Sequence, residues 1–266
     1  MELTPEGASV PNSLIIGGFD GSTVRIGPTG QVTVLTGVTS PGCGNETAMA
    51  QIAAENLHCD ISRVKVIQGD TESCPWGLGN YSSRAVMLGG SAVEKAATVL
   101  AERMGTVAAE MLEADNIDIV CEDERFFVKG NPDQYVEFKD VVAQFYRHPH
   151  GPYMESSEPA LEFTHHFRIE NVYHQPERQG RLSTYPAWPY GAAACIAEVD
   201  VETGFVNIER YVYVHDAGRI VNPLLVEANL HGGISQGIGG AMYEEILYDD
   251  NGQPTTATFM DYTIPT

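Results

Sequence analysis

The stretch from Ser91 to Leu112 restricts the fold of this 266-residue chain more than any other part of its sequence. Its apolar residues recur at the i, i+3, i+4 and i+7 spacing that places side chains on one face of an α-helix. The residues on that face are Val93, Ala96, Ala97, Leu100, Met104, Val107, Ala108 and Met111. We therefore predict a long amphipathic helix here, with this face turned toward the protein core.

The other segments mix strand and helix patterns without the regular order of a βαβ protein. Alternation of apolar and polar residues predicts strands, and runs of helix-forming residues predict helices. The predicted strands are Gly30–Leu35, Ser62–Gln68, Ile117–Val120, Phe126–Val128, Phe163–Ile169, Gly191–Val201 and Phe205–His215. The other predicted helices are Glu46–Leu57, Val136–Tyr146 and a segment that Asn222-Pro223 opens and that runs through Leu224–Gly232. This mixture predicts an α+β fold of mixed sheets packed with helices.

The two halves of the chain follow a similar pattern. Each has a hairpin with a glycine turn, at Gly30 and at Gly204, followed by a polar loop and a helix with a glycine-rich neighbour. We expect two similar subdomains, residues 1–150 and 191–266, joined by a proline-rich seam over residues 151–190.

Composition argues against several classes of function. The formal net charge of −21 disfavours binding to nucleic acid or anionic lipid, because both normally require a basic patch. No apolar run approaches the ~20 residues of a membrane span, and Met1–Glu6 is not a secretory signal. The five cysteines are odd in number and lack CxxC spacing, which favours free thiols over disulfides or a zinc site. We therefore expect a cytoplasmic protein that holds any anionic ligand locally, with backbone amides and a few arginines.

The loop Gly42-Cys43-Gly44-Asn45-Glu46-Thr47 lies between a predicted strand and a predicted helix. Amides at a helix start lack intrahelical partners and carry partial positive charge, so they can hold an anion. Glycine lets the backbone approach a ligand without a Cβ atom in the way. The alternative is a strand-to-helix turn with an ordinary N-cap, and a short Gly-x-Gly does not decide between the two.

Two further segments carry the same kind of signal. Asn80–Arg84 combines hydroxyls with an arginine that suits phosphate oxygens, although for this segment alone a polar loop before a helix capped by Ser91 is the favoured explanation. His231–Ala241 holds five glycines within nine residues, each of which weakens a helix by about 0.5–1 kcal/mol relative to alanine. Either close helix packing or a ligand along the backbone accounts for them, with the Gln236 amide supplying a donor and an acceptor.

Other chemistry has weaker support. The histidines at 148, 150, 165, 166 and 174 crowd the proline-rich seam, but their spacing fits no metal-binding pattern. The aromatic run Tyr185–Tyr190 has two interpretations: it contacts a substrate, or it is a structural cover for the seam. Cys43 next to a helix start is a candidate thiol nucleophile of a hydrolase, without a visible Cys-His pairing. A Gly-x-Ser-x-Gly elbow and a Walker A loop are absent from the sequence.

Taken in order, these segments resemble the second molybdenum-cofactor-binding domain of the molybdenum hydroxylases. This family contains xanthine dehydrogenase, aldehyde oxidase and aerobic carbon monoxide dehydrogenase, and the resemblance extends over almost the whole chain. The matching segments are Val34–Gly37 through Gln51–Ala53, Val66–Pro75, Ser83-Arg84 with Gly89–Ala92, Val214–Gly218, Ile220–Pro223, and His231–Gly239 through Glu244-Glu245.

The resemblance implies hydroxylation of a carbon centre of a small-molecule substrate, with oxygen from water, at molybdenum held by a molybdopterin, in bacteria usually as the cytosine dinucleotide. It implies FAD and two [2Fe-2S] clusters on partner subunits or domains. It further implies a first molybdenum domain and a C-terminal remainder of the large subunit as partners. The cofactor-binding residues it implies are Gly42, Cys43, Gly44, Asn45, Ser83, Arg84, Gln236 and Gly237.

The chain also departs from the family pattern. Cys43 stands where the family usually has Gln, Asn45 where it has His, and Ala85 where it has the second Ser of Ser-Arg-Ser. The family's catalytic base is a Glu in a Gly-x-Gly-Glu motif beyond the matched region, so we expect no catalytic residue and no protein ligand to the metal within this chain. The leading hypothesis is therefore a cofactor-binding portion that is inactive alone. The alternative is a non-catalytic assembly module of the same fold that has lost the cofactor.

Overall fold

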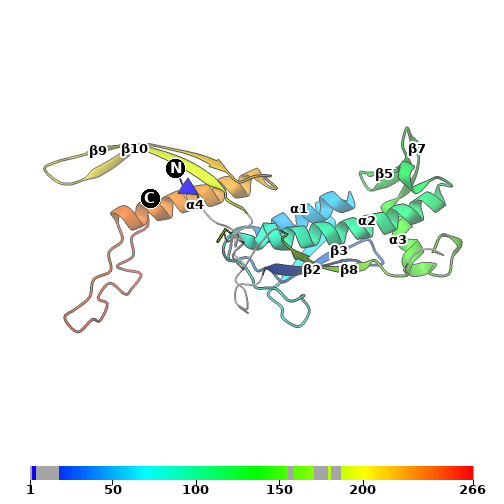
Figure 1. Cartoon of the computed structure of the whole chain (residues 1–266), viewed down its shortest axis with the longest axis horizontal. Coiled ribbons are helices and arrows are strands. Elements are labelled where there is room, and N and C mark those ends of the chain that lie inside the picture. Colours follow the sequence, from blue (N-terminus) through cyan, green and yellow to red (C-terminus); the bar gives the residue numbers. More distant parts are fainter. Residues whose placement is uncertain (1, 4–17, 155–157, 171–178, 181–186, 266) are drawn as a thin grey trace. The chain divides into compact units, whose positions relative to one another are not determined.

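The computed structural model describes residues 2–3, 18–154, 158–170, 179–180 and 187–265, and its elements are labelled in Figure 1. The described chain forms two compact units, Met1–Arg219 and Ile220–Thr266, which are treated separately below. Mixed sheets and helices confirm the predicted α+β class. The predicted subdomain boundaries, and the aromatic run up to residue 186, remain predictions, since part of the seam lies outside the described residues.

The first unit is organised around a four-stranded mixed sheet in the order β4-β3-β2-β8. Its strands are β2 (Phe19–Ile26), β3 (Val32–Thr36), β4 (Val64–Gln68) and β8 (Glu162–Arg168). Strand β2 runs antiparallel to both β3 and β8, whereas β3 and β4 are parallel. A parallel pair needs a crossover, and the crossover here is the helix predicted over Glu46–Leu57.

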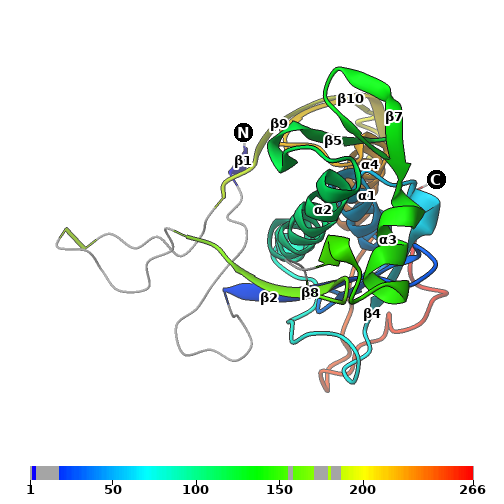
Figure 2. The ribbon, with the colours of Figure 1, turned by 90° about the vertical axis from the view of Figure 1, so that its right-hand side faces the viewer.

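Helices α1 (Asn45–Leu57) and α2 (Ser91–Met111) lie together on one face of this sheet (Figure 2). Seven residues of the predicted apolar face of α2 are fully buried, which confirms the amphipathic helix predicted from the sequence. They are Val93, Ala96, Ala97, Leu100, Met104, Val107 and Ala108. These side chains form one core with the β2 and β3 residues Val24, Ile26, Val32 and Val34. Helix, sheet and core thus support each other in the first unit.

A small antiparallel sheet, β5-β6-β7, and a short helix complete this part of the first unit. The elements are β5 (Ile119–Glu122), β6 (Arg125–Val128), β7 (Asn131–Glu137) and α3 (Phe138–Arg147). Strand β7 was not predicted, because Pro132 and a run of polar residues hide its pattern. It is an edge strand, where proline is tolerated.

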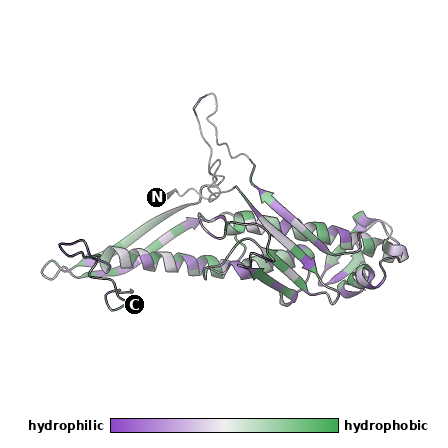
Figure 3. Ribbon diagram, turned by 90° about the horizontal axis from the view of Figure 1, so that it is seen from below, coloured by the Kyte–Doolittle hydropathy of each residue, from purple (hydrophilic) through white to green (hydrophobic). Residues whose placement is uncertain are grey.

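The first unit also contains the predicted hairpin of β9 (Tyr190–Val199) and β10 (Val206–Asp216). The short strand β1 (Glu2–Leu3) pairs with β9, which gives the order β1-β9-β10. Apolar residues of this hairpin are coloured green on the ribbon in Figure 3. Several of their side chains are exposed, for example Val214 at 67%.

The second unit is dominated by α4 (Pro223–Met242). Its start agrees with the sequence: Pro223 occupies the first turn, and the Asn222 side chain accepts a hydrogen bond from the Leu225 amide at 3.1 Å. The predicted end was wrong, because the helix continues through the glycine-rich stretch for 20 residues in all. Helix-forming neighbours and unbroken backbone bonding outweigh the low helix propensity of glycine. None of the helices in the described part of the chain is long and apolar enough to span a membrane.

Glu124 in the β5–β6 turn ties the small sheet to the segment that follows α1. Its carboxylate accepts hydrogen bonds from the Arg63 guanidinium and from the Asp60 amide at 3.1 Å. The Arg63 hydrogen bonds hold the pKa of Glu124 below its usual value. A carboxyl whose pKa falls on folding stabilises the protein above its unfolded-state pKa, and this contribution is lost as the pH drops through the folded-state pKa.

Glu124→Gln is therefore expected to lower the free energy of unfolding by about 1 kcal/mol at pH 7 and to have little effect near pH 3. Denaturant unfolding at both pH values measures this difference. Glu122→Gln, at an exposed carboxylate of β5, is the matched control and is expected to be neutral. An equal loss for Glu124→Gln at both pH values would contradict an ionic contribution.

Candidate functional site

The first glycine loop ends at the exposed start of α1. Gly44 is the N-cap in a left-handed conformation with φ 84°, and no side chain caps the helix. The first backbone bond of the helix joins the Ala48 amide to the Gly44 carbonyl at 3.1 Å, so the three preceding amides lack intrahelical acceptors. Gly42 has φ 110°, and a Cβ atom there would meet no atom within 4 Å. The loop therefore offers open backbone and uncapped amides, an arrangement that suits an anion.

Asn45 has a different position from its neighbours Cys43 and Gly44. Its side chain is buried, and Nδ2 donates a hydrogen bond to the Thr39 carbonyl at 3.1 Å. This bond fixes the loop from inside. The predicted contact of Asn45 with a cofactor remains a prediction, whereas its role in holding the loop is visible in the structure.

The second predicted loop lies directly against the first. The backbones of Gly37 and Gly77 are so close that a Cβ atom on Gly37 would lie 2.5 Å from Gly77 Cα. The Gly79 backbone amide donates to the Gly37 carbonyl at 3.2 Å, and the side-chain Nδ2 atom of Asn80 lies 3.3 Å from Cys43 Sγ. Segments 37 positions apart in the sequence thus meet at the end of β3.

Ser82 and Ser83 occupy an unusual backbone conformation. Their φ values are 49° and 51°, a left-handed region that costs a residue with a Cβ atom roughly 1–2 kcal/mol. Ser83 is exposed. A π-helical turn, Ala85–Gly90, follows and leads into α2, and such turns occur frequently at functional sites. Strain in this position needs compensation from neighbouring contacts.

The glycines that follow have a packing role. A Cβ atom on Gly89 would lie 2.3 Å from Val38 Cγ2, and one on Gly90 would lie 2.9 Å from Ile52 Cδ1. These two glycines let the π-helical turn approach β3 and α1 closely. The alternative of helix packing therefore explains Gly89 and Gly90, whereas it does not explain the open position of Gly42.

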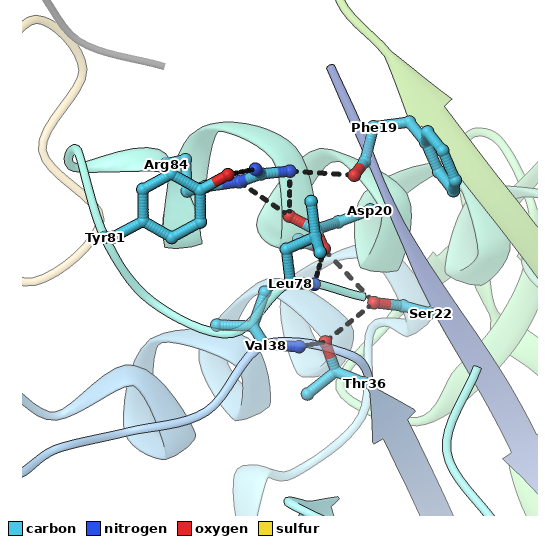
Figure 4. A network of polar contacts seen from close by, with 9 residues as sticks. Phe19, Asp20, Ser22, Thr36, Val38, Leu78, Tyr81 and Arg84 are labelled. Atoms are coloured by element: carbon cyan, nitrogen blue, oxygen red, sulfur yellow. Dashed lines mark hydrogen bonds and ion pairs between the residues drawn. The ribbon is translucent and has the colours of Figure 1, made fainter. Parts of the chain in front are cut away.

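Arg84 is fully buried and contacts a carboxylate that the sequence did not single out. Its Nε and Nη2 atoms lie 3.1 and 2.8 Å from Asp20 Oδ2 (Figure 4), and neither side chain is exposed. Nη2 also donates to the Phe19 carbonyl at 2.8 Å, and Nη1 donates to the Tyr81 hydroxyl. The predicted contact of Arg84 with a pterin or phosphate remains a prediction. Its visible contacts tie the second loop to β2.

The Asp20 carboxylate joins β2 to both ends of the second loop. Besides Arg84, it accepts a hydrogen bond from the Leu78 amide at 3.1 Å. Burial raises the pKa of Asp20, and the neighbouring Arg84 charge opposes that rise. The sequence carried no usable signal for Asp20, because the strand that holds it, β2, was not predicted and its burial is visible only in the structure. The partner itself could not be identified from the sequence.

Gln236 and Gly237 lie in α4 of the second unit. A Cβ atom at Gly232, Gly233, Gly237 or Gly240 would meet no atom within 4 Å. Packing inside the described chain therefore does not require these four glycines. The proximity of Gln236 to the first two loops remains a prediction, because α4 belongs to the separate second unit.

Burial argues against two of the cysteines as nucleophiles. None of the five cysteines forms a disulfide. Burial raises the pKa of Cys59 to about 11 and that of Cys121 to about 12, which makes both unreactive. Cys43 Sγ accepts a hydrogen bond from the Asn80 side-chain Nδ2 atom. Within the described residues, no group of three or more His, Cys, Asp or Glu side chains is arranged to hold a metal ion.

Comparison with known proteins gives consistent results. Residues 3–266 match a family model described as a molybdopterin cofactor-binding domain. The chain is 38% identical over 94% of its length to the gamma subunit of the 6-hydroxypseudooxynicotine dehydrogenase complex of Paenarthrobacter nicotinovorans. It is 34% identical over 93% of its length to the carbon monoxide dehydrogenase large chain of Afipia carboxidovorans. It spans only 29% and 28% of these two relatives.

Solved structures show the same relationship. Quinoline 2-oxidoreductase from Pseudomonas putida 86 superimposes on 99% of this chain with a TM-score of 0.82 and 35% identity. A Cu,Mo-containing carbon monoxide dehydrogenase superimposes on 99% of the chain with a TM-score of 0.83 and 32% identity. The chain covers 32% and 31% of these two structures.

Proposed function

We propose that this chain forms one wall of the cofactor site of a molybdenum-dependent hydroxylase. The premise is that the chain belongs to the molybdopterin cofactor-binding domain family. The observation that carries this proposal is the meeting of two glycine loops beside an uncapped helix start, marked by the contact between Asn80 and Cys43. Uncapped amides and glycines without side chains are what a large anionic cofactor needs from a protein of strongly negative charge.

The described residues fit a molybdopterin without a basic cluster. Gly42 and Gly44 give a ligand access to the backbone, and the amides at the start of α1 hold a phosphate or pterin oxygen. The exposed Ser83 hydroxyl donates a further hydrogen bond, and the Gln236 amide offers a donor and an acceptor from α4. When bound, the molybdenum centre supplies the redox chemistry by which water-derived oxygen reaches a carbon of the substrate.

The remainder of the enzyme is part of the same proposal. Exposed apolar side chains, such as Val214 on β10 and Leu224 on α4, suit cover by a first molybdenum domain and a C-terminal part of a large subunit. The relatives' greater length supports this arrangement. The proposal includes a cytosine dinucleotide form of the cofactor, FAD and [2Fe-2S] clusters on partner subunits, a small-molecule substrate and a cytoplasmic location.

The chain alone is expected to be inactive, because its candidate site residues bind and orient a ligand and none of them is a catalytic base. The proposal can be tested in the complete enzyme complex with Gly44→Val and Gln236→Ala. In Gly44→Val, the valine side chain occupies the position from which a ligand would contact the backbone. Gln236→Ala removes hydrogen bonding of about 1 kcal/mol, which weakens cofactor retention about fivefold.

Molybdenum and pterin content per folded complex are the measurements, and both are expected to fall. Gly130→Val is the matched control, because Gly130 has a positive φ like Gly44 but lies in the β6–β7 turn. Gln31→Ala is the control for the amide. Normal metal loading in both test variants would refute the site. Native complex with all its subunits and no molybdenum would instead support the assembly module.

A further inference from the structure

Asp20 is the only fully buried carboxylate among the residues that the structure describes. Its two oxygens have separate partners: Oδ1 accepts the Leu78 amide, and Oδ2 accepts Nε and Nη2 of Arg84. Leu78 and Arg84 are the two ends of the segment that contains Ser82 and Ser83. One carboxylate on β2 therefore fixes both ends of this loop (Figure 4).

The geometry inside the loop explains why such fixing is needed. Ser82 and Ser83 both have positive φ, which an unconstrained segment would relax. The Arg84 guanidinium, held by Asp20, also lies 4.9 Å from the centre of the Tyr81 ring and donates to the Tyr81 hydroxyl. Hydrogen bonds to charged groups are stronger than those between neutral groups, so these contacts can oppose the strain.

The adjacent polar residues on β2 and β3 extend the same arrangement. Ser22 lies two positions after Asp20 on β2, and its hydroxyl donates to Thr36 Oγ1 at 3.0 Å. Thr36 Oγ1 in turn accepts a hydrogen bond from the Val38 amide at 3.2 Å, in the segment between β3 and the first glycine loop. Asp20 and Ser22 thus fix the second and first loops respectively from the same strand. Neither needs to touch a ligand to do so.

We propose that Asp20 is a positioning residue for the cofactor site, which holds the Leu78–Arg84 segment so that the Ser83 hydroxyl faces the ligand. This inference rests on the proposed function. The carboxylate is needed in its ionised form, since both oxygens accept hydrogen bonds while Arg84 carries the balancing charge. An asparagine amide at position 20 has only one oxygen that can accept a hydrogen bond. It would therefore present either its NH2 group or an uncharged oxygen to Arg84.

The test is Asp20→Asn, with Asp20→Glu as the variant that retains the charge and Asp118→Asn as a control at an exposed acidic residue. Amide hydrogen exchange of the full chain reports the loop, denaturant unfolding reports global stability, and molybdenum content of the complete complex reports cofactor retention. Asp20→Asn is expected to speed exchange at residues 78–84 about tenfold relative to the α2 amides and to lower molybdenum content. Asp20→Glu is expected to restore part of the slow exchange at residues 78–84 and part of the molybdenum content.

The outcomes separate three cases. A uniform rise in exchange across the chain, matching the loss of global stability, would overturn the positioning role and leave Asp20 as a purely structural residue. Normal molybdenum in Asp20→Asn together with reduced molybdenum in Gly44→Val would also overturn it, while the proposed function stands. Normal molybdenum in Asp20→Asn, Gly44→Val and Gln236→Ala would remove the proposed function itself.

A milder variant keeps the test decisive if Asp20→Asn does not fold. Tyr81→Phe removes the hydroxyl that Arg84 contacts but leaves the buried ion pair in place. Faster exchange confined to residues 78–84, with lower molybdenum content, is expected. Unchanged exchange and unchanged molybdenum in both Tyr81→Phe and Asp20→Glu would overturn the proposal, because Asp20→Glu displaces the carboxylate that fixes the loop.

Discussion

Arg84→Met is expected to lower the free energy of unfolding by about 3–5 kcal/mol at neutral pH, because it leaves the buried Asp20 carboxylate without its charge partner. Methionine replaces much of the arginine stem, so little of the loss comes from packing. Urea unfolding of the chain measures the effect. Arg25→Met is the matched control: Arg25 pairs with Glu162 at 2.6 Å, but both side chains are about half exposed, and a loss below about 1 kcal/mol is expected.

The pH dependence of the Arg84→Met variant distinguishes charge from shape. Without Arg84, only the hydrogen bond from the Leu78 amide opposes the rise that burial causes in the Asp20 pKa. A carboxyl whose pKa rises on folding destabilises the protein as the pH increases from its unfolded-state value to its folded-state value. The decrease in the free energy of unfolding caused by Arg84→Met should therefore become smaller toward pH 4, as Asp20 takes up a proton. A loss that does not change with pH would contradict the ionic explanation.

A double variant completes this test. Asp20→Leu combined with Arg84→Met replaces the ion pair by apolar side chains, and such replacements are often neutral or stabilising. We expect the double variant to recover most of the stability lost in Arg84→Met. A double variant as unstable as Arg84→Met would show that the loss does not come from the unpaired carboxylate.

Gly37→Ala is expected to destabilise the first unit by about 3 kcal/mol, the upper end of the usual cost of overpacking. Its new Cβ atom would lie 2.5 Å from Gly77 Cα, 2.7 Å from Gly77 N and 2.9 Å from the Pro75 carbonyl oxygen. All three are backbone atoms, so no side-chain rotation can relieve the clash. The two glycine loops must move apart, and cofactor loading of the complete complex should fall with the stability.

The matched control is Gly27→Ala in the β2–β3 turn. Its Cβ atom would meet only the Gln31 carbonyl, at an ordinary distance of 3.7 Å, and its effect should stay within about 0.5 kcal/mol. Thermal unfolding of both variants gives the comparison. Equal stability of Gly37→Ala and Gly27→Ala would mean that the two loops do not meet as described.

The periodic part of the fold could be predicted from the sequence because burial acts on local patterns. The α2 ladder and the strands β3, β4, β9 and β10 follow from the spacing of apolar residues, which repeats within one element. Where pattern and propensity were weak, prediction failed: β2 and β7 went unrecognised, and α4 continues through glycines that were expected to follow it. Pairing with neighbouring strands stabilises β2 and β7, whereas the backbone hydrogen bonds of α4 outweigh the low helix propensity of its glycines.

The candidate site divides along the same line. The glycine loops and Ser83 could be found because glycine and hydroxyl residues before a helix are a local signal. Asp20 could not be paired with Arg84 in this way, since the two are 64 positions apart and no local rule joins them.

The amino-acid sequence by itself determined the α+β class, the long helix and the family to which this chain belongs. Each depends on residue order or on spacing within one segment. Only the tertiary structure decided that Arg84 and Asn45 point inward, that Gly37 and Gly77 touch, and that one buried carboxylate holds both ends of a strained loop. Such contacts arise from how separate segments pack, and their energies depend on a burial that exists only once the chain has folded.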